Sequence, residues 1–212
     1  MAIALPWIPP IHLGRDAPGT AALAQFAGNA ATAARPCTFP SPSFSTADPS
    51  LLPRHGWMIN ESRQRIGRGH AAYARAARAL EALECCQLNW LTAHMQDGVL
   101  AICSRQLGGV WVMNANLILR RESQRHCSSV TFRTTTRHLL AGEERLAVTW
   151  DETTDDVHFE VLSFSRPRHA LSWLSYPYVL YQQRRFARDA TTKMAWSIAY
   201  DSISTGRALT VR

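Results

Sequence analysis

The sequence has almost no lysine and lacks the short motifs that mark common catalytic and metal sites. Lys193 is the only lysine, so 22 of the 23 basic residues are arginine. A GxSxG motif, an HExxH motif and a Ser-His-Asp arrangement are all missing. The eight histidines are scattered singly. The sequence therefore predicts neither a metal site nor a bound cofactor.

The sequence also lacks long apolar runs, cysteines with CxxC spacing and blocks of like charge. No apolar run reaches the roughly 18 residues that a membrane helix needs. Five cysteines without CxxC spacing indicate reduced thiols, which predicts a cytoplasmic protein. The apolar N-terminus lacks a basic start and contains prolines, which is atypical of a signal peptide.

The formal net charge is +7, and it has two interpretations. It reflects either the base composition of the genome or an affinity for phosphates and anionic surfaces. No run of about five like charges occurs, which argues against a nucleic-acid-binding tail.

Proline usage divides the chain. Residues 1–55 hold nine of the eleven prolines and are expected to form a Pro/Ala/Ser-rich extended arm or linker. A single folded domain is expected over residues 56–198, followed by a tail at 199–212.

The arm is either low-complexity filler or a segment draped over the domain through Trp7, Ile8 and Phe26. A weak helix within it is expected to be interrupted at Gly28 and Asn29, because glycine and asparagine are poor helix formers.

The clearest helix is expected over residues 70–88, where alanine dominates and Arg75 and Arg78 belong to a solvated stripe. Gly67 and Gly69 precede it. Without a third glycine or a following Lys-Ser, this Gly-x-Gly predicts a tight strand-to-helix turn rather than a phosphate loop.

From residue 99 onward the pattern alternates with a period of two, which predicts at least five consecutive strands in an antiparallel meander. The expected strands are 99–104, 110–121, 128–136 and two within 138–167. In the second, an apolar face begins at Trp111 and Met113. A last helix is expected from about Arg168 to Ser197, kinked or restarted at Pro177.

The hairpin at 138–167 carries the most distinctive charges. Alternation places Glu144 on the same face as Leu146 and Val148, at the end of a buried row. A buried charge is costly unless it is paired. Glu143 and Arg145 are expected to form an exposed pair on the other face.

The second strand of this hairpin changes phase, and two explanations are open. A bulge near Val161 would turn Arg166 inward as a partner for Glu144. If both faces are covered instead, Arg166 caps the rim, and Ser163 and Ser165 face the interior.

Several pieces of the sequence resemble an uncharacterised bacterial and plant family, labelled domain of unknown function nineteen-ninety. The matching elements are Gly67 and Gly69, His138, Gly142-Glu143-Glu144-Arg145, Phe164-Ser165-Arg166-Pro167 and Gln183-Arg184-Arg185. The resemblance covers roughly residues 50–190. Leu146 stands where the family usually has Phe, and Arg133 and Arg137 stand where it tends to have glycines.

The family's activity is not established, so the resemblance implies no reaction. Its element order is similar to that of helix-grip, START-like (SRPBCC, Bet v 1-like) domains. The resemblance and the strand count together predict an α+β fold, with a curved antiparallel sheet wrapped around a long C-terminal helix.

In such a fold, a cavity between sheet and helix is expected to bind a small apolar or amphipathic molecule, unless side chains fill a solid core. The predicted ligand contacts are Trp111, Phe132, Glu144, Trp150, Phe159, Ser163, Ser165, Arg166, Tyr178 and Tyr181.

Two alternative functions are open. One is an enzyme of the cyclase, hydrolase or isomerase type, in which His138, Glu144 and Arg166 converge on one cavity. The other is binding of an anionic surface or a nucleic acid through arginines of the last helix, namely Arg184, Arg185 and Arg188.

Overall fold

The computed structural model describes residues 2–3, 11–13, 16–33, 36, 56–136, 138–168 and 170–208. The strands are β1 (Ala2–Ile3), β2 (Ile11–Leu13), β3 (Met58–Arg68), β4 (Leu91–Gln96), β5 (Val99–Arg105), β6 (Val110–Ser123), β7 (Cys127–Thr134), β8 (Leu140–Asp151) and β9 (Asp156–Pro167). The helices are α1 (Thr20–Ala33), α2 (Gly69–Glu81), α3 (Ala170–Leu174) and α4 (Tyr176–Ala208), with short 3₁₀ turns at Glu84–Cys86 and Leu107–Gly109.

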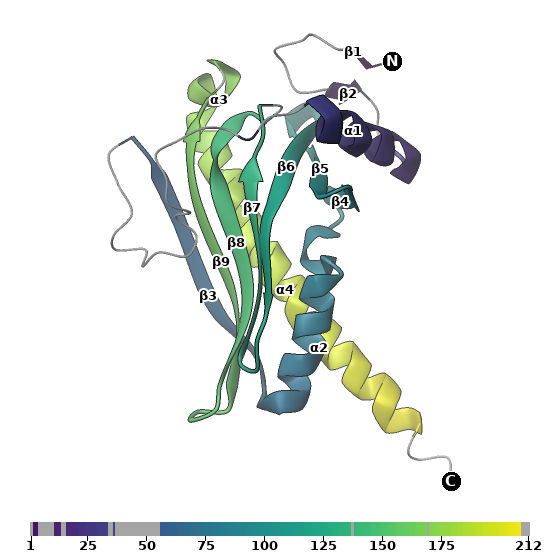
Figure 1. Cartoon of the computed structure of the whole chain (residues 1–212), viewed down its shortest axis with the longest axis vertical. Coiled ribbons are helices and arrows are strands. Elements are labelled where there is room, and N and C mark those ends of the chain that lie inside the picture. Colours follow the sequence, from purple (N-terminus) through teal and green to yellow (C-terminus); the bar gives the residue numbers. More distant parts are fainter. Residues whose placement is uncertain are drawn as a thin grey trace.

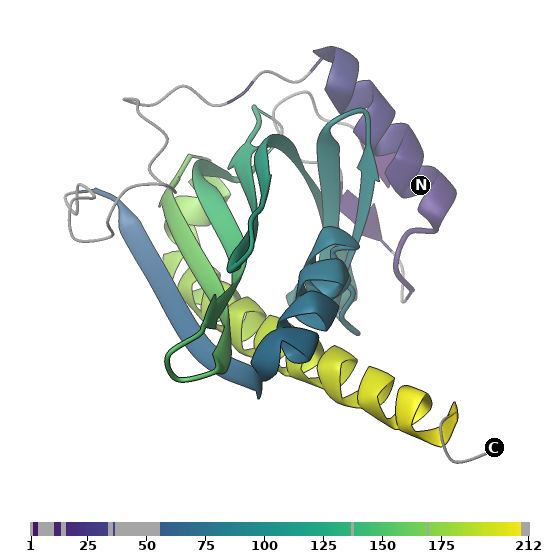
Figure 2. The ribbon, with the colours of Figure 1, turned by 60° about the horizontal axis from the view of Figure 1, so that its bottom comes forward.

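A curved antiparallel sheet forms the frame of the molecule. Strands β4 to β9 follow one another as a meander, and β3 pairs with β9 at the far edge. Helix α4 crosses the concave side with α2 beside it (Figures 1 and 2). The predicted α+β fold, in which the sheet wraps a long C-terminal helix, is confirmed.

Both faces of the sheet bury apolar side chains. On the concave face, α2 and α4 pack on residues such as Leu146 and Phe159. On the opposite face, α1 packs on β5 and β6 through residues that include Val99 and Met113. Two separate cores therefore share one sheet.

Helix α1 differs from the sequence-based expectation of an extended arm. It runs through Gly28 and Asn29 without a break. Leu23, Phe26 and Ala27 are buried against the sheet. This burial offsets the low helix propensity, since tertiary packing supplies most of the stability of a short helix. Trp7 and Ile8 lie outside the described residues.

The turn into α2 confirms the structural interpretation of Gly67 and Gly69. Gly69 has φ of +82° and begins the helix, while the register between β3 and β9 shifts just before Gly67. The helix ends at Glu81, earlier than expected, because Leu83 adopts a left-handed conformation with φ of 55°. That reversal brings the following 3₁₀ turn into the core.

The C-terminal helical region is divided next to Pro177, as expected. Helix α3 ends at Leu174 and α4 starts at Tyr176, so the proline lies in the first turn, where its missing amide hydrogen costs nothing. Helix α4 continues to Ala208, beyond the Ser197 expected from the sequence.

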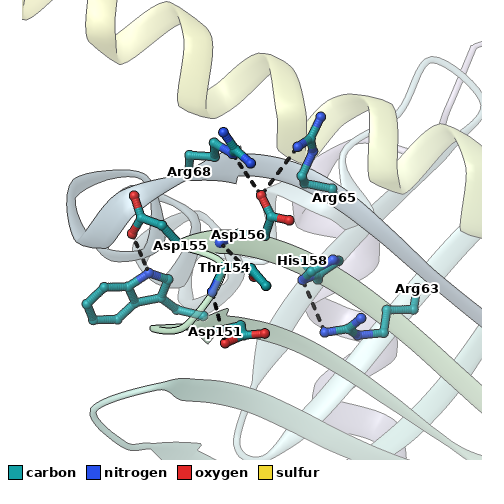
Figure 3. Close-up of polar contacts among 9 residues, drawn as sticks. Arg63, Arg65, Arg68, Asp151, Thr154, Asp155, Asp156 and His158 are labelled. Atoms are coloured by element: carbon teal, nitrogen blue, oxygen red, sulfur yellow. Dashed lines mark hydrogen bonds and ion pairs between the residues drawn. The ribbon is translucent and has the colours of Figure 1, made fainter.

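Ion pairs connect β3, which lies at the edge of the sheet, with its neighbour β9. Arg63 pairs with Glu160 at 3.0 Å, and Arg65 and Arg68 pair with Asp156 at 3.3 and 2.9 Å. Figure 3 shows the two arginines converging on Asp156 near the β8–β9 turn. Each arginine is more than half exposed, so each pair contributes little stability. Charged side chains on an edge strand also oppose pairing with another chain.

Candidate functional site

A cavity of about 430 Å³ lies between the concave face of the sheet and the first turns of α4. Its volume falls within the range of small-molecule sites. Leu107 lines the cavity and is 75% exposed, so the cavity opens to solvent beside the 3₁₀ turn that precedes β6. This end of the interior is hollow. The alternative that side chains fill a solid core therefore does not hold here.

Four cavity residues form a row across neighbouring strands. Phe132 on β7 is paired with Glu144 on β8, Glu144 with Ser163 on β9, and Ser163 with Asn60 on β3. All four line the cavity. The register of the sheet therefore delivers a carboxyl group and a hydroxyl group to the same part of the wall.

One oxygen of the Glu144 carboxyl group lacks a hydrogen-bond partner. Its Oε1 atom is inaccessible and makes no hydrogen bond within the described structure. Burial raises the pKa of Glu144 to about 7, because a charge is poorly solvated there. The sequence expectation that this residue points inward is therefore correct, but none of the described residues forms an ion pair with it.

His138 lines the cavity next to the start of β8. Its Nδ1 accepts a hydrogen bond from the Leu140 amide at 2.9 Å, so the neutral ring carries its hydrogen on Nε2. Burial, together with the smaller effect of the Arg168 charge, lowers the pKa of His138 to about 4. The imidazole is therefore a neutral hydrogen-bond donor near neutral pH.

Two glutamines of α4 present oxygen atoms to the interior. Gln183 donates its Nε2 to Ser165 Oγ at 3.0 Å, and Gln182 donates its Nε2 to Tyr178 Oη at 2.8 Å. The Oε1 atoms of both glutamines are inaccessible and lack a hydrogen-bond partner within the described residues. Both acceptors are therefore unsatisfied, and a ligand reaches them only if the side chains shift slightly.

Gly142 allows two strands to approach closely beside this site. A Cβ atom at this position would meet the Phe164 carbonyl oxygen and lie 2.7 Å from Ser165 Cα. Thr134 Oγ1 accepts from the Gly142 amide at 2.9 Å and donates to its carbonyl at 3.2 Å. A glycine is therefore required where the Gly-Glu-Glu-Arg segment starts.

The structure brings together about half of the predicted site residues. The cavity is lined by His138, Phe132, Glu144, Ser163 and Tyr178. Ser165 lines a smaller adjoining hollow of about 60 Å³ that shares Glu144 and Ser163. The predicted residues that line neither hollow are Trp111, Trp150, Phe159, Arg166 and Tyr181.

Arg166 lies on the outer face of the sheet. The β8–β9 register runs without a shift, so no bulge turns Arg166 inward. Its guanidinium stacks over Trp57, with its carbon 4.6 Å from the ring centroid. Ser163 and Ser165 face inward, as the second explanation of the phase change predicted. The proposed convergence of Arg166 with His138 and Glu144 is therefore wrong.

Three of the four remaining aromatic residues belong to packed regions, and the fourth, Tyr181, is exposed. Trp111 is buried under α1 on the opposite face. Trp150 packs on His70 and Tyr73 of α2, and Phe159 is fully buried in the same core. Tyr181 is 55% exposed. Helix α2 thus fills the far end of the concave face and leaves the hollow under the start of α4.

Glu143 is not an exposed partner of Arg145. Its side chain is completely inaccessible, and Arg133 Nε donates to its Oε1 at 2.8 Å. Arg145 instead lies 3.6 Å from Glu160. The outer face next to Glu143 is covered in part by a small apolar cluster, which comprises Trp57, Ile59, Leu162 and Phe164.

The arginines of α4 make contacts within the protein. Arg185 stacks over Trp90 at 4.1 Å, and its Nε lies 3.5 Å from Asp189. Arg188 pairs with Asp189 at 2.9 Å. Arg184 is exposed. Two of the three arginines that were predicted to bind an anionic partner, Arg185 and Arg188, therefore already contact other residues of the protein.

Sequence reasoning missed Gln182, Gln183 and Asn60 as cavity residues. A signal for Gln183 was present, since it falls at helical spacing between Val179 and Phe186 on the inward stripe of α4. A polar residue at an inward helical position indicates either a buried hydrogen bond or a binding site.

Replacing Glu144 by glutamine is expected to stabilise the protein by roughly 2 kcal/mol at about pH 8 and to change stability little at about pH 5. The fold raises the pKa of this carboxyl from 4.5 to about 7. The stability gained by protonation is therefore present below pH 4.5 and is lost as pH rises through 7. Urea unfolding of both proteins at the two pH values measures the difference.

Glu152→Gln is the matched control, because Glu152 lies on the surface in an ion pair with Arg125. The lowered pKa of His138 affects wild type and variant alike, so it cancels in the comparison. The same stability difference at both pH values would contradict an unpaired Glu144.

No group of three or more His, Cys, Asp or Glu residues is placed to hold a metal ion within the described part of the chain. The described helices also include none that is long and apolar enough to cross a membrane.

A curved antiparallel sheet closed over a long C-terminal helix, with a ligand-sized cavity between them, defines a helix-grip domain. Within this class the chain belongs to the family described as Domain of unknown function (DUF1990), whose profile matches residues 42–193. The resemblance that the Gly-Glu-Glu-Arg and Phe-Ser-Arg-Pro segments indicated is thereby confirmed.

Two relatives come from eukaryotes. The UPF0548 protein At2g17695 of Arabidopsis thaliana is 30% identical over 153 residues, which are 67% of this chain and 74% of the relative. A UPF0548 protein of Dictyostelium discoideum is 27% identical over 153 residues, which are 64% of this chain and 70% of the relative.

Solved structures share the general shape at low sequence identity. The di-domain ARO/CYC BexL from the BE-7585A biosynthetic pathway is 12% identical, with 68% of this chain and 50% of that chain covered and a TM-score of 0.49. Ara h 8.0201 is 8% identical, with 68% and 99% covered and a TM-score of 0.46.

Proposed function

We propose that the protein binds a small apolar or amphipathic molecule in the cavity under α4. The observation that carries this proposal is the hollow of about 430 Å³, whose wall contains inaccessible polar atoms without partners. Buried polar atoms are normally hydrogen-bonded, and leaving one unsatisfied costs about 1–3 kcal/mol. A bound molecule that fills the hollow and, after small side-chain shifts, pairs with these atoms would account for both features.

The apolar part of the wall supports the same proposal. Phe132, Ile102, Val179 and Phe186 line the cavity. Contact with apolar groups contributes roughly 25 cal/mol for each Å² removed from water, while a few polar groups set the orientation of a ligand.

Native mass spectrometry of the protein purified from its own host tests this function. We expect a retained small molecule in wild type. Val179→Trp places an indole in the cavity and is expected to abolish retention by filling the space. Thr192→Trp on the exposed side of α4 is the matched control and should retain the molecule. A protein that carries no molecule, or a Val179→Trp variant that still retains it, contradicts the proposal.

A further inference from the structure

Among the described residues, the cavity wall contains no arginine or lysine side chain, although the protein is basic. None of the described residues that line the cavity is arginine or lysine, whereas the whole chain has 23 of them. The acid-base groups in the wall are Glu144, His138 and Tyr178. Near neutral pH, none of these provides a positive charge. Arg168 and Arg185 act on His138 and Tyr178 only from outside the lining. An anionic ligand such as a fatty acid would therefore bury its carboxylate without a basic side chain of the described wall in contact with it, which is costly.

Three side chains in the wall have acceptor atoms without partners, whereas His138 Nε2 supplies a donor. Glu144, Gln182 and Gln183 each have an inaccessible Oε1 without a partner. The two glutamine nitrogens are already used as donors inside the protein. Ser163 Oγ also lacks a partner and can donate or accept. Beside Glu144, the wall therefore matches a ligand that brings a donor.

An ammonium group meets these requirements. It offers three donors and no acceptor, and it supplies the positive charge that the Glu144 carboxylate lacks. Charge-assisted hydrogen bonds are stronger than neutral ones, particularly where water is excluded.

The position of the apolar wall suggests how such a molecule lies. Glu144 Oε1 is inaccessible, whereas Leu107 is at the exposed opening. Val179 and Leu139 also line the cavity. We propose that the cavity selects an amphipathic amine, which places its ammonium group against Glu144 and its apolar chain toward Leu107. This inference rests on the proposed binding function.

Three compounds with the same chain and different head groups test the inference. Octylamine, octan-1-ol and octanoate are titrated calorimetrically into the full-length protein at neutral pH. We expect octylamine to bind about tenfold or more tightly than octanol, and octanoate to bind least. Glu144→Gln should remove the preference for the amine while retaining octanol binding. Gln183→Met should weaken octylamine binding to a smaller extent.

Glu152→Gln is the control and should leave all three affinities unchanged, because Glu152 lies outside the cavity. Thermal unfolding confirms that each variant is folded. The inference is overturned if octanoate binds as tightly as octylamine, or if octylamine does not bind. It is also overturned if the Glu144→Gln variant still prefers the amine. If the amine preference fails but wild type retains a host molecule that the Val179→Trp variant loses, the proposed binding function still holds. If wild type retains no molecule, both the binding function and the amine preference are overturned.

Discussion

Arg133→Ala is expected to lower the free energy of unfolding by about 3–5 kcal/mol. Arg133 donates to Glu143, whose side chain is inaccessible to water. Without the guanidinium, the carboxylate keeps its desolvation cost and loses the attraction that offsets it. Urea unfolding at neutral pH measures the loss.

Two further variants separate burial from charge. Arg125→Ala breaks a pair whose side chains are 77% and 47% exposed, and it should cost less than about 1 kcal/mol. The double variant Arg133→Leu/Glu143→Leu should recover most of the lost stability, because apolar residues avoid the desolvation cost of the pair. If Arg133→Ala costs no more than Arg125→Ala, the pair does not carry the proposed energy.

Gly142→Ala is expected to destabilise the protein by about 3 kcal/mol or more. The added methyl group would meet backbone atoms of Phe164 and Ser165, which cannot rotate away as a flexible side chain can. Strands β8 and β9 must separate to accommodate it. Thermal and urea unfolding measure the effect.

Gly19→Ala is the matched control, since a Cβ at Gly19 would have no neighbour within 4 Å. It should leave stability nearly unchanged. Equal stabilities for the two alanine variants would show that the strands can separate at little cost.

Alternation along β8 correctly predicted the direction of Glu144 but not the surroundings of Glu143. A period of two assigns residues to two faces, and it does not say what covers each face. Here the outer face is covered beside Glu143, where Trp57 stacks on Phe164 with ring centroids 4.2 Å apart. The partner of Glu143 is Arg133 on the neighbouring strand, which the pattern within one strand does not reveal.

The same limit explains the placement of Trp111. Its apolar row on β6 was assigned to the ligand side, but α1 covers that row and the opposite row contributes Asn114 to the cavity. The spacing of Leu23, Phe26 and Ala30 in the N-terminal region was the available signal for a covering helix. Gly28 and Asn29 obscured it, because propensity alone predicts an interruption.

Strand order and the division at Pro177 were more accessible to prediction, since both depend on local features. Short turns between consecutive strands favour a meander, and proline ends or starts helices for steric reasons. The cavity was harder to predict from the sequence, because its position depends on where α2 stops filling the concave face of the sheet.

Helix α1 has a consequence for the region that this chain shares with its relatives. It precedes residue 42, where the family match begins, yet it covers Val99, Trp111 and Met113 inside that match. A protein trimmed to the family boundary would present these side chains to water as one apolar patch. Patches of that kind promote self-association. In this chain, a segment outside the shared region therefore covers an apolar surface within that region.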